Sequence, residues 1–380
     1  MNSFDQVFSG VDERGSRWGL LQKKSRFIKS IWIAIVLIAS LSSCLRDHLP
    51  PSQIAGPVDW MSELDPQMKE VIDEFLLLNP TPLWQLSTEE ARKRPTIKDA
   101  VNSLLVKKGQ PIPMPNVTTS ELFLPGSPPL MVRAVVYKPA TATGPLPVIV
   151  YYHGGGWVLA SPEVYEASTK GLAEKVGAIV VSVDYHRAPE NKFATAHVDC
   201  YKAYKWVKEN AASLGGDPAK VAVAGESAGG NMSVGVCMMA RDSGTALPVH
   251  QLLVYPVANN DLMTESYIKY QNAKPLDKPL IEWFTARYFK TPADGDSPLI
   301  SLVDVANLSG LPPATIIAAQ IDPLQTEGQQ LRDKFMKSGV KVTYLLYEGT
   351  THEFFGTNAL VSKAEQAQNF AAAQLKEAFK

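Results

Sequence analysis

Cysteine is scarce in this sequence of 380 residues: only three are present, and none has the Cys/His spacing of a metal site. Cys200 and Cys237 lie in stretches with a helical pattern. We expect both to be buried free thiols, because cysteine is among the residue types most often buried. A disulfide between them is the alternative if the protein is exported, and it would require their Cα atoms to lie within bonding reach.

An excess of charge of one sign is also missing. Lysine and arginine total 37 against 38 aspartate and glutamate, which gives a net charge of −1. No field of one sign exists to attract nucleic acid or broadly acidic substrates, so we expect no nucleic-acid partner. Apolar residues make up 45% and charged residues 20%, as in ordinary globular proteins. The oligomeric state stays open, a dimer included.

Long apolar runs are absent except for residues 31–41, which carry no charge and follow four basic residues between positions 23 and 29. This run is short for a bilayer span but suits the apolar region of a secretory signal. It ends in Leu-Ser-Ser-Cys, which resembles the bacterial lipobox, where cleavage precedes a cysteine that receives lipid. We expect residues 1–43 to be a lipoprotein leader and Cys44 to be the lipidation site.

The protein is therefore expected to be exported and anchored by lipid to a bacterial membrane, on its periplasmic or cell-surface side. Two alternatives remain for this segment: an uncleaved anchor helix and an ordinary signal cleaved without lipidation. The long stretch before the basic cluster leaves open a translation start further downstream. Residues 44–59 are polar and contain proline, and we interpret them as a tether.

Residues 60–115 are predicted to form a helical segment ahead of the main domain. Asp65 offers an N-cap followed by proline at the first helical position, and apolar residues then recur at helical spacing. Ser87 and Glu90 are spaced as a capping box for a second helix. The segment either packs on the domain or covers a pocket as the first part of a cap.

From residue 116 to 380 apolar, β-branched runs alternate with helical patterns. Most gaps from the third strand onward are long enough for a crossover helix, so we predict an α/β fold with a mostly parallel sheet of eight strands and helices on both faces. The predicted strands are 117–123, 130–137, 146–152, 178–183, 220–225, 250–257, 314–321 and 341–347. The gap at 259–312 is too long for a simple crossover, and we expect it to form the second part of a cap. A helix over 361–379 closes the chain.

The sequence Gly-Glu-Ser-Ala-Gly at positions 225–229 follows one predicted strand and precedes a helical run. This is the G-x-S-x-G pattern in the strand–turn–helix context that it needs. Glycines are required because the turn is strained and neighbouring backbones approach closely. The helix N-terminus favours negative charge that develops on a substrate. The pattern predicts Ser227 as a nucleophile.

A glycine run, Gly154 to Gly156, lies between His153 and Trp157 and directly follows the strand at 146–152. Backbone N–H groups there can point at a carbonyl oxygen that becomes an oxyanion. Such preorganised donors are worth about 3–4 kcal/mol each. The alternative is a tight loop without a catalytic role. We interpret His153 as an anchor of this loop rather than as a base.

A better general base is His352, which follows the last predicted strand and precedes the C-terminal helix. Asp322, at the end of the preceding strand, is the expected acid that orients this imidazole. Glu327 and Glu353 are poorer choices, since the first lies a helical turn later and the second is adjacent to the histidine. The chain order serine, aspartate, histidine is the order expected of α/β-hydrolases.

Together these motifs, HGGGW, GESAGG, DPL and THEFFG, resemble those of the hormone-sensitive lipase family of esterases, over roughly residues 116–380. The resemblance implies the α/β-hydrolase fold with a helical cap. It also implies an oxyanion hole formed by the amides of Gly155, Gly156 and Ala228. Glu226 stands where aspartate is commoner, and we interpret it as a supporting residue.

A further stretch, residues 184–190, resembles the D-Y-R-L-A-P-E segment of that family. It departs from the pattern at His186 and Arg187, which stand in place of arginine and leucine, so the contacts of this loop are not implied by the resemblance.

The expected reaction is hydrolysis of a small carboxylic ester by a two-step acyl transfer, and it requires no metal or cofactor. The resemblance favours short-chain esters over long triglycerides. One alternative is a non-catalytic receptor on the same fold, which would be expected to lack the general base. The others are amide or lactone hydrolysis with the same three residues, since fold and triad do not fix the substrate.

Overall fold

A computed structural model describes residues 56–127 and 131–380 of the chain. The predicted leader, its apolar run and Cys44 lie outside the described residues. Within the described ranges, no helix is both long enough and apolar enough to cross a membrane.

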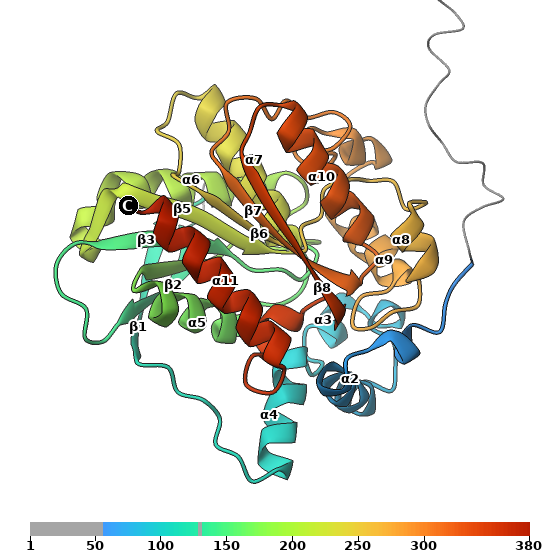
Figure 1. Cartoon of the computed structure of the whole chain (residues 1–380). Coiled ribbons are helices and arrows are strands. Elements are labelled where there is room, and N and C mark those ends of the chain that lie inside the picture. Colours follow the sequence, from blue (N-terminus) through green and yellow to red (C-terminus); the bar gives the residue numbers. More distant parts are fainter. Residues whose placement is uncertain (1–55, 128–130) are drawn as a thin grey trace, which may run out of the picture. The chain divides into compact units, whose positions relative to one another are not determined.

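An eight-stranded sheet lies at the centre of residues 56–380 (Figure 1). The strands are ordered β1-β2-β4-β3-β5-β6-β7-β8. Strand β2 is antiparallel to β1 and β4, and the strands from β4 through β3 to β8 are parallel. Their bounds are β1 Val117–Pro125, β2 Met131–Pro139, β3 Leu146–Tyr152, β4 Ile179–Asp184, β5 Gly216–Glu226, β6 Gln251–Val254, β7 Ala314–Ile321 and β8 Val342–Thr351. The predicted fold class and all eight predicted strands are confirmed.

Several strand ends differ from the prediction, most of them by one or two residues. The larger differences are at β5, β6 and β8, and β8 continues to Thr351 rather than ending at 347. Strand β6 ends at Val254 rather than at 257, because Tyr255 has a positive φ of 34° and Pro256 has no N–H to donate to a ladder. Strand β5 begins at Gly216, ahead of the predicted 220, where its first residue pairs with Leu146 across an irregularity in the register.

Helices cover both faces of the sheet, because successive strand residues point to opposite sides. Val148 and Val150 of β3 belong to the core shared with α6, α7 and α10, whereas Ile149 and Tyr151 belong to the core shared with α5 and α11. The bounds of these helices are α5 Glu166–Val176, α6 Thr195–Asn210, α7 Ala228–Asp242, α10 Gln325–Lys337 and α11 Ser362–Ala378. The cysteines on α6 and α7, at 200 and 237, are buried free thiols, as predicted.

The segment ahead of the sheet contains one helix more than predicted. Its elements are η2 Trp60–Glu63, α2 Pro66–Leu78, η3 Leu83–Gln85, α3 Thr88–Ala91 and α4 Ile97–Lys107, where η denotes a short 3-10 helix. Asp65 caps α2 and the Ser87–Glu90 capping box is formed, as predicted. However, α3 is a single turn, since Pro95 disfavours helix at the residue before it. Thr96 then begins α4 with a capping box of its own.

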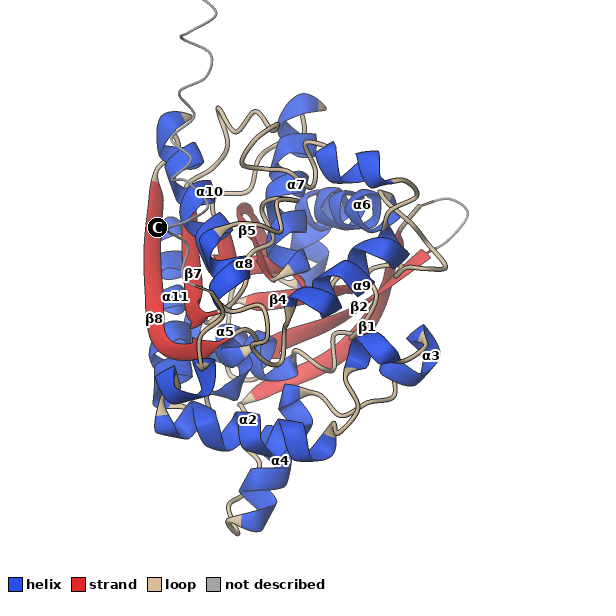
Figure 2. Ribbon diagram, turned by 90° about the vertical axis from the view of Figure 1, so that its right-hand side faces the viewer, coloured by secondary structure: helices blue, strands red, loops and turns tan. Residues whose placement is uncertain are grey.

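The insertion between β6 and β7 contains α8 Glu265–Lys269 and α9 Lys278–Tyr288. It contacts the N-terminal helical segment directly, and Figure 2 shows α3 beside α9. The indole Nε1 of Trp283 donates to the carbonyl of Leu86 at 3.2 Å. The Arg287 guanidinium stacks over the Trp283 ring at 3.6 Å, and its Nε donates to Thr88 Oγ1 at 3.0 Å. We call these two segments, 60–108 and 259–312, the cap.

Candidate active site

Ser227 occupies a strained turn between β5 and α7. Its φ of 57° is in the left-handed region, where a residue with a side chain is uncommon. The glycines on either side of it are required because the neighbouring backbone leaves no room for a side chain. A Cβ on Gly229 would lie 1.9 Å from the carbonyl oxygen of Tyr152, and one on Gly225 would lie 2.3 Å from the backbone of Gly229. The turn therefore presents the serine hydroxyl at the end of the sheet.

Three side chains predicted from separate motifs meet at this turn. His352, which follows β8, places Nε2 2.9 Å from the Ser227 hydroxyl oxygen. Its Nδ1 lies 2.7 Å from a carboxylate oxygen of Asp322, which follows β7. The other carboxylate oxygen accepts from the Leu324 amide at 2.9 Å. With Nδ1–H donated to the carboxylate, Nε2 is free to accept the serine proton.

The environment of His352 favours its charged form. Burial lowers the pKa of this histidine, but the charge and the hydrogen bond of Asp322 outweigh burial, so the pKa is raised above its ordinary value. All three side chains are almost fully buried. An imidazolium that forms when His352 takes a proton is thus stabilised by the adjacent Asp322 carboxylate.

The backbone amides proposed for an oxyanion hole lie beside Ser227. In a trans peptide the C=O and the following N–H point in opposite directions, so a bonded carbonyl fixes the direction of the next amide. The Gly155 carbonyl accepts from two amides of the following turn, at 3.0 and 2.8 Å, which orients the Gly156 N–H. The Ser227 carbonyl accepts from the Val257 amide at 3.2 Å, which orients the Ala228 N–H. Both glycines line a cavity that includes Ser227.

Two cavities meet at Ser227. The larger, about 450 Å³, lies against the insertion half of the cap, and its wall includes Trp157 and Phe289. The smaller, about 120 Å³, lies against the N-terminal half of the cap, and His352 and Glu353 belong to its wall alone. In residues 56–127 and 131–380, no cluster of three or more His, Cys, Asp and Glu side chains is placed to hold a metal ion.

Glu226 is buried behind the turn and does not face the hydroxyl of its neighbour. The hydroxyls of Tyr151 and Tyr255 both donate to its carboxylate. Burial raises the pKa of Glu226 to about 7, against the opposing effect of the hydrogen bonds from the two tyrosines. Neither cavity is lined by Glu226. It holds the base of the turn, in agreement with a supporting role.

His153 is buried beside the glycine run and lines neither of the cavities at Ser227. Its Nδ1 is 2.8 Å from the Gly154 carbonyl, and its ring stacks on Tyr185 at 4.3 Å between centroids. Burial lowers the pKa of His153 to about 4, so the ring is neutral at ordinary pH. Gly154 must be glycine, because a Cβ there would lie 2.3 Å from the Tyr165 hydroxyl. The side chain anchors the loop, as the sequence suggested.

The aromatic residues of the insertion divide between the cavity wall and the packing beside it. Phe284 and Phe289 line the larger cavity, whereas Tyr288 of the same helix does not and instead stacks on Trp157 at 4.7 Å. Leu276, which lines both cavities, was missed. A lone leucine in a long insertion carries no sequence signal, since its place in the wall depends on how the insertion folds back.

Comparison with known proteins agrees with this geometry. A family model described as alpha/beta hydrolase fold matches residues 149–356. The chain is 39% identical to a carboxylesterase of Mycobacterium tuberculosis over 246 residues, which cover 64% of this chain and 77% of that protein. It is 32% identical to an arylesterase of Saccharolobus solfataricus over 295 residues, covering 77% of this chain and 93% of the relative. The solved structure of a Pyrobaculum calidifontis esterase superposes with a TM-score of 0.72 at 34% identity, covering 83% of this chain and 98% of that one.

Proposed function

Because this chain belongs to the α/β-hydrolase family, in the hormone-sensitive-lipase-like group, we propose that it is a carboxylesterase with Ser227, His352 and Asp322 as its catalytic triad. The observation that carries the proposal is the continuous hydrogen-bonded chain from the serine hydroxyl through the imidazole to the carboxylate. The relatives named as a carboxylesterase and an arylesterase support the same reaction.

In the proposed mechanism, His352 takes the hydroxyl proton as Ser227 attacks the ester carbonyl carbon. Negative charge that develops on the carbonyl oxygen is stabilised by the amides of Gly155, Gly156 and Ala228. The tetrahedral intermediate collapses, His352 protonates the departing alcohol, and an acyl-enzyme remains. Water, deprotonated by the same imidazole, then attacks this ester and releases the carboxylic acid and the free serine.

The position of His352 indicates which cavity would hold the alcohol and which the acyl group of the ester. The departing alcohol oxygen must lie within reach of Nε2, so the alcohol occupies the smaller cavity, which has the imidazole in its wall. The acyl group then occupies the larger cavity, about 450 Å³, at the small end of the roughly 300–1,000 Å³ usual for ligand sites. These sizes fit a short-chain acyl group on a small alcohol rather than a long-chain triglyceride.

The test is a panel of ethyl esters from acetate to laurate, hydrolysed by the wild type and by Ser227→Ala. We expect kcat/KM to be highest for short acyl chains and the alanine variant to be inactive. Undiminished hydrolysis by Ser227→Ala would contradict the proposal. Matched anilides are expected to react far more slowly, and rapid anilide cleavage would favour amide hydrolysis instead.

A non-catalytic receptor is disfavoured by His352, since the base that such a receptor would lack is present and hydrogen-bonded to Ser227.

We also propose that the protein is exported and lipid-anchored through Cys44. The support is the sequence alone: a basic flank, an uncharged apolar run at 31–41 and a lipobox-like end. Cells that express the full chain are expected to label it with a radioactive fatty acid, and Cys44→Ala is expected to abolish the label. Labelling that survives this substitution contradicts the proposal.

A further inference from the structure

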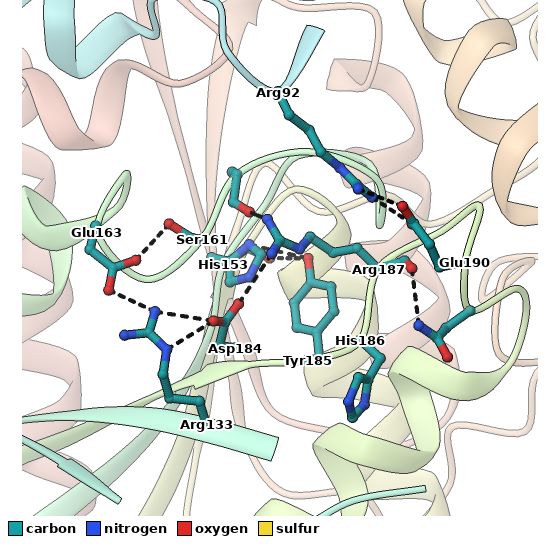
Figure 3. A network of polar contacts seen from close by, with 12 residues as sticks. Arg92, Arg133, His153, Ser161, Glu163, Asp184, Tyr185, His186, Arg187 and Glu190 are labelled. Atoms are coloured by element: carbon teal, nitrogen blue, oxygen red, sulfur yellow. Dashed lines mark hydrogen bonds and ion pairs between the residues drawn. The ribbon is translucent and has the colours of Figure 1, made fainter. Parts of the chain in front are cut away.

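The loop that follows β4 packs against the start of the glycine run, where Tyr185 points at His153 (Figure 3). Tyr185 is the central residue of this contact and is only 1% exposed. Its hydroxyl lies 3.0 Å from the carbonyl oxygen of His153 and 3.1 Å from that of Gly154. The single hydroxyl proton is therefore shared by the carbonyls of His153 and Gly154, and the hydroxyl oxygen also lies 3.3 Å from Nδ1 of His153.

The Gly154 carbonyl receives a second hydrogen bond, from Nδ1 of His153 at 2.8 Å. The ring of that histidine stacks on the ring of Tyr185, so each of the two donors helps to hold the other in place. The neutral ring carries its proton on Nδ1, because the opposing nitrogen has no partner within the described part of the chain and is buried. Since C=O and N–H of one peptide point in opposite directions, these donors aim the amide of Gly155 at the site.

The far end of the same turn is held independently. Arg92, which comes from the cap, donates through Nε to the Val158 carbonyl at 3.0 Å. Arg187 donates to the carbonyl of Ala160, a residue with a φ of 66°. Figure 3 shows Arg92 also reaching Glu190, and Arg187 also reaching Asp184. Because these contacts hold the turn, loss of one hydroxyl would tilt a peptide rather than unfold the loop.

We propose that Tyr185 is a positioning residue for the oxyanion hole, whose hydroxyl fixes the peptide that presents the Gly155 amide to the substrate. This inference rests on the proposed esterase function. Tyr185 does not line either cavity beside Ser227, so it acts through the peptide and not by contact with substrate. The loss of its hydroxyl therefore weakens transition-state stabilisation and leaves substrate binding unchanged.

The chain offers a matched control. Tyr204 is fully buried, and its hydroxyl donates to a backbone carbonyl, that of Ala246, at 2.6 Å. Tyr204→Phe and Tyr185→Phe each remove one buried hydroxyl that donates to backbone carbonyl oxygen, but only the second contact lies at the glycine run. A merely structural role for Tyr185 would give the two variants the same kinetic result.

The experiment measures kcat and KM for a short-chain ethyl ester, and the inhibition constant of a trifluoromethyl ketone, which forms a tetrahedral oxyanion with the serine. Removing one oxyanion donor outright costs about 10²–10³ in kcat, so misaiming one is expected to cost about 10- to 100-fold. In Tyr185→Phe we expect kcat and ketone affinity to fall by the same factor, with KM unchanged. In Tyr204→Phe we expect wild-type values of all three.

The proposal is overturned if Tyr185→Phe keeps wild-type kcat, if its loss lies in KM, or if ketone affinity does not change. Should this variant fail to fold, substitutions of His153 test the same peptide group, because its Nδ1 also donates to the Gly154 carbonyl. His153→Asn, whose side-chain amide can replace Nδ1 as a donor, is expected to retain kcat, and His153→Leu is expected to lose it. Equal kcat in these two variants overturns the proposal as well. A wild type that hydrolyses no ester would instead refute the proposed function.

Discussion

The Asp322 carboxylate binds Nδ1 of His352 at 2.7 Å and is fully buried. Asp322→Asn is expected to keep the fold but to let the imidazole adopt the tautomer with its proton on Nε2. That nitrogen could then no longer accept the proton of Ser227. We expect kcat to fall by roughly 10⁴. Steady-state kinetics on the short-chain ester measure the loss, and a thermal unfolding curve close to wild type excludes misfolding; a loss of less than tenfold would argue against Asp322 as the acid.

The same carboxylate sets the pH dependence of activity. His352 must be neutral to act as a base, so kcat/KM is expected to rise with pH as this residue loses its proton. Because Asp322 raises the pKa of His352 above its ordinary value of 6.5, the midpoint is expected above that value. The measurement is kcat/KM against pH for a substrate that does not itself titrate. In Asp322→Asn the residual activity should have a lower midpoint, because the effect of burial on the pKa of His352 is then opposed only by the smaller effects of Glu353 and Glu226. An unchanged midpoint contradicts this assignment.

Single residues were predictable where a motif ties chemistry to a local turn. Ser227 and the glycine run follow buried strands, and His352 follows the last strand, so their meeting at one sheet edge could be expected. Tyr185 was not predicted, because its partners are carbonyl oxygens, which any sequence supplies. Arg92 was missed for a related reason: its bidentate partner, Glu190, is 98 residues away and on a different element.

At the scale of elements, Trp283 is one of the residues that join the two halves of the cap, and its contribution can be measured separately. Trp283→Phe removes the hydrogen bond to Leu86 but keeps a ring under Arg287, and is expected to cost about 1 kcal/mol. Trp283→Ala removes both and is expected to cost about 3 kcal/mol or more. Denaturant unfolding measures both costs. Hydrogen exchange should show residues 83–91 losing protection in the alanine variant; protection equal to that of the wild type would show that α3 is held by other contacts.

The catalytic domain was predicted better than the cap for a physical reason. Strands buried on both faces are continuous apolar runs, and the length of the gaps between them indicates crossover helices. The helix α4 was missed because its signals, a threonine cap after Pro95, are short and local. The end of α3 was not predicted, since a capping box marks where a helix begins and not where it ends.

At the scale of the whole molecule, the assignment of the two cavities predicts two separable changes of specificity. Phe289 lines only the larger cavity, so Phe289→Ala is expected to raise kcat/KM for longer acyl groups relative to acetate by about tenfold. Leu83 lines the smaller cavity and not the larger, so Leu83→Ala is expected to favour larger alcohols instead. Both changes in kcat/KM are measured with two series of esters, one in which only the acyl group varies and one in which only the alcohol varies. If the two variants change the opposite ends of the substrate, the cavities are assigned the wrong way round.

The buried carboxyl of Glu226 links the stability of the whole molecule to pH. Burial raises its pKa to about 7 in the folded state, against 4.5 as the reference value for an unfolded chain. Below pH 4.5 both states hold the proton, and above pH 7 both have lost it. Between these values the folded state binds more protons than the unfolded state, so the free energy of unfolding decreases as pH rises.

Glu226→Gln removes this titration while keeping a side chain of the same shape between Tyr151 and Tyr255. Urea unfolding of the wild type and the variant, at intervals from pH 4 to pH 8, measures the difference in the free energy of unfolding. We expect the wild type to lose stability relative to the variant through the window from 4.5 to 7, and the difference to be constant above it. The slope inside the window is at most about 1.4 kcal/mol per pH unit for one proton. A difference that is constant over the whole range would mean that Glu226 is already ionised in the folded protein, with the two tyrosine hydroxyls outweighing the cost of burial.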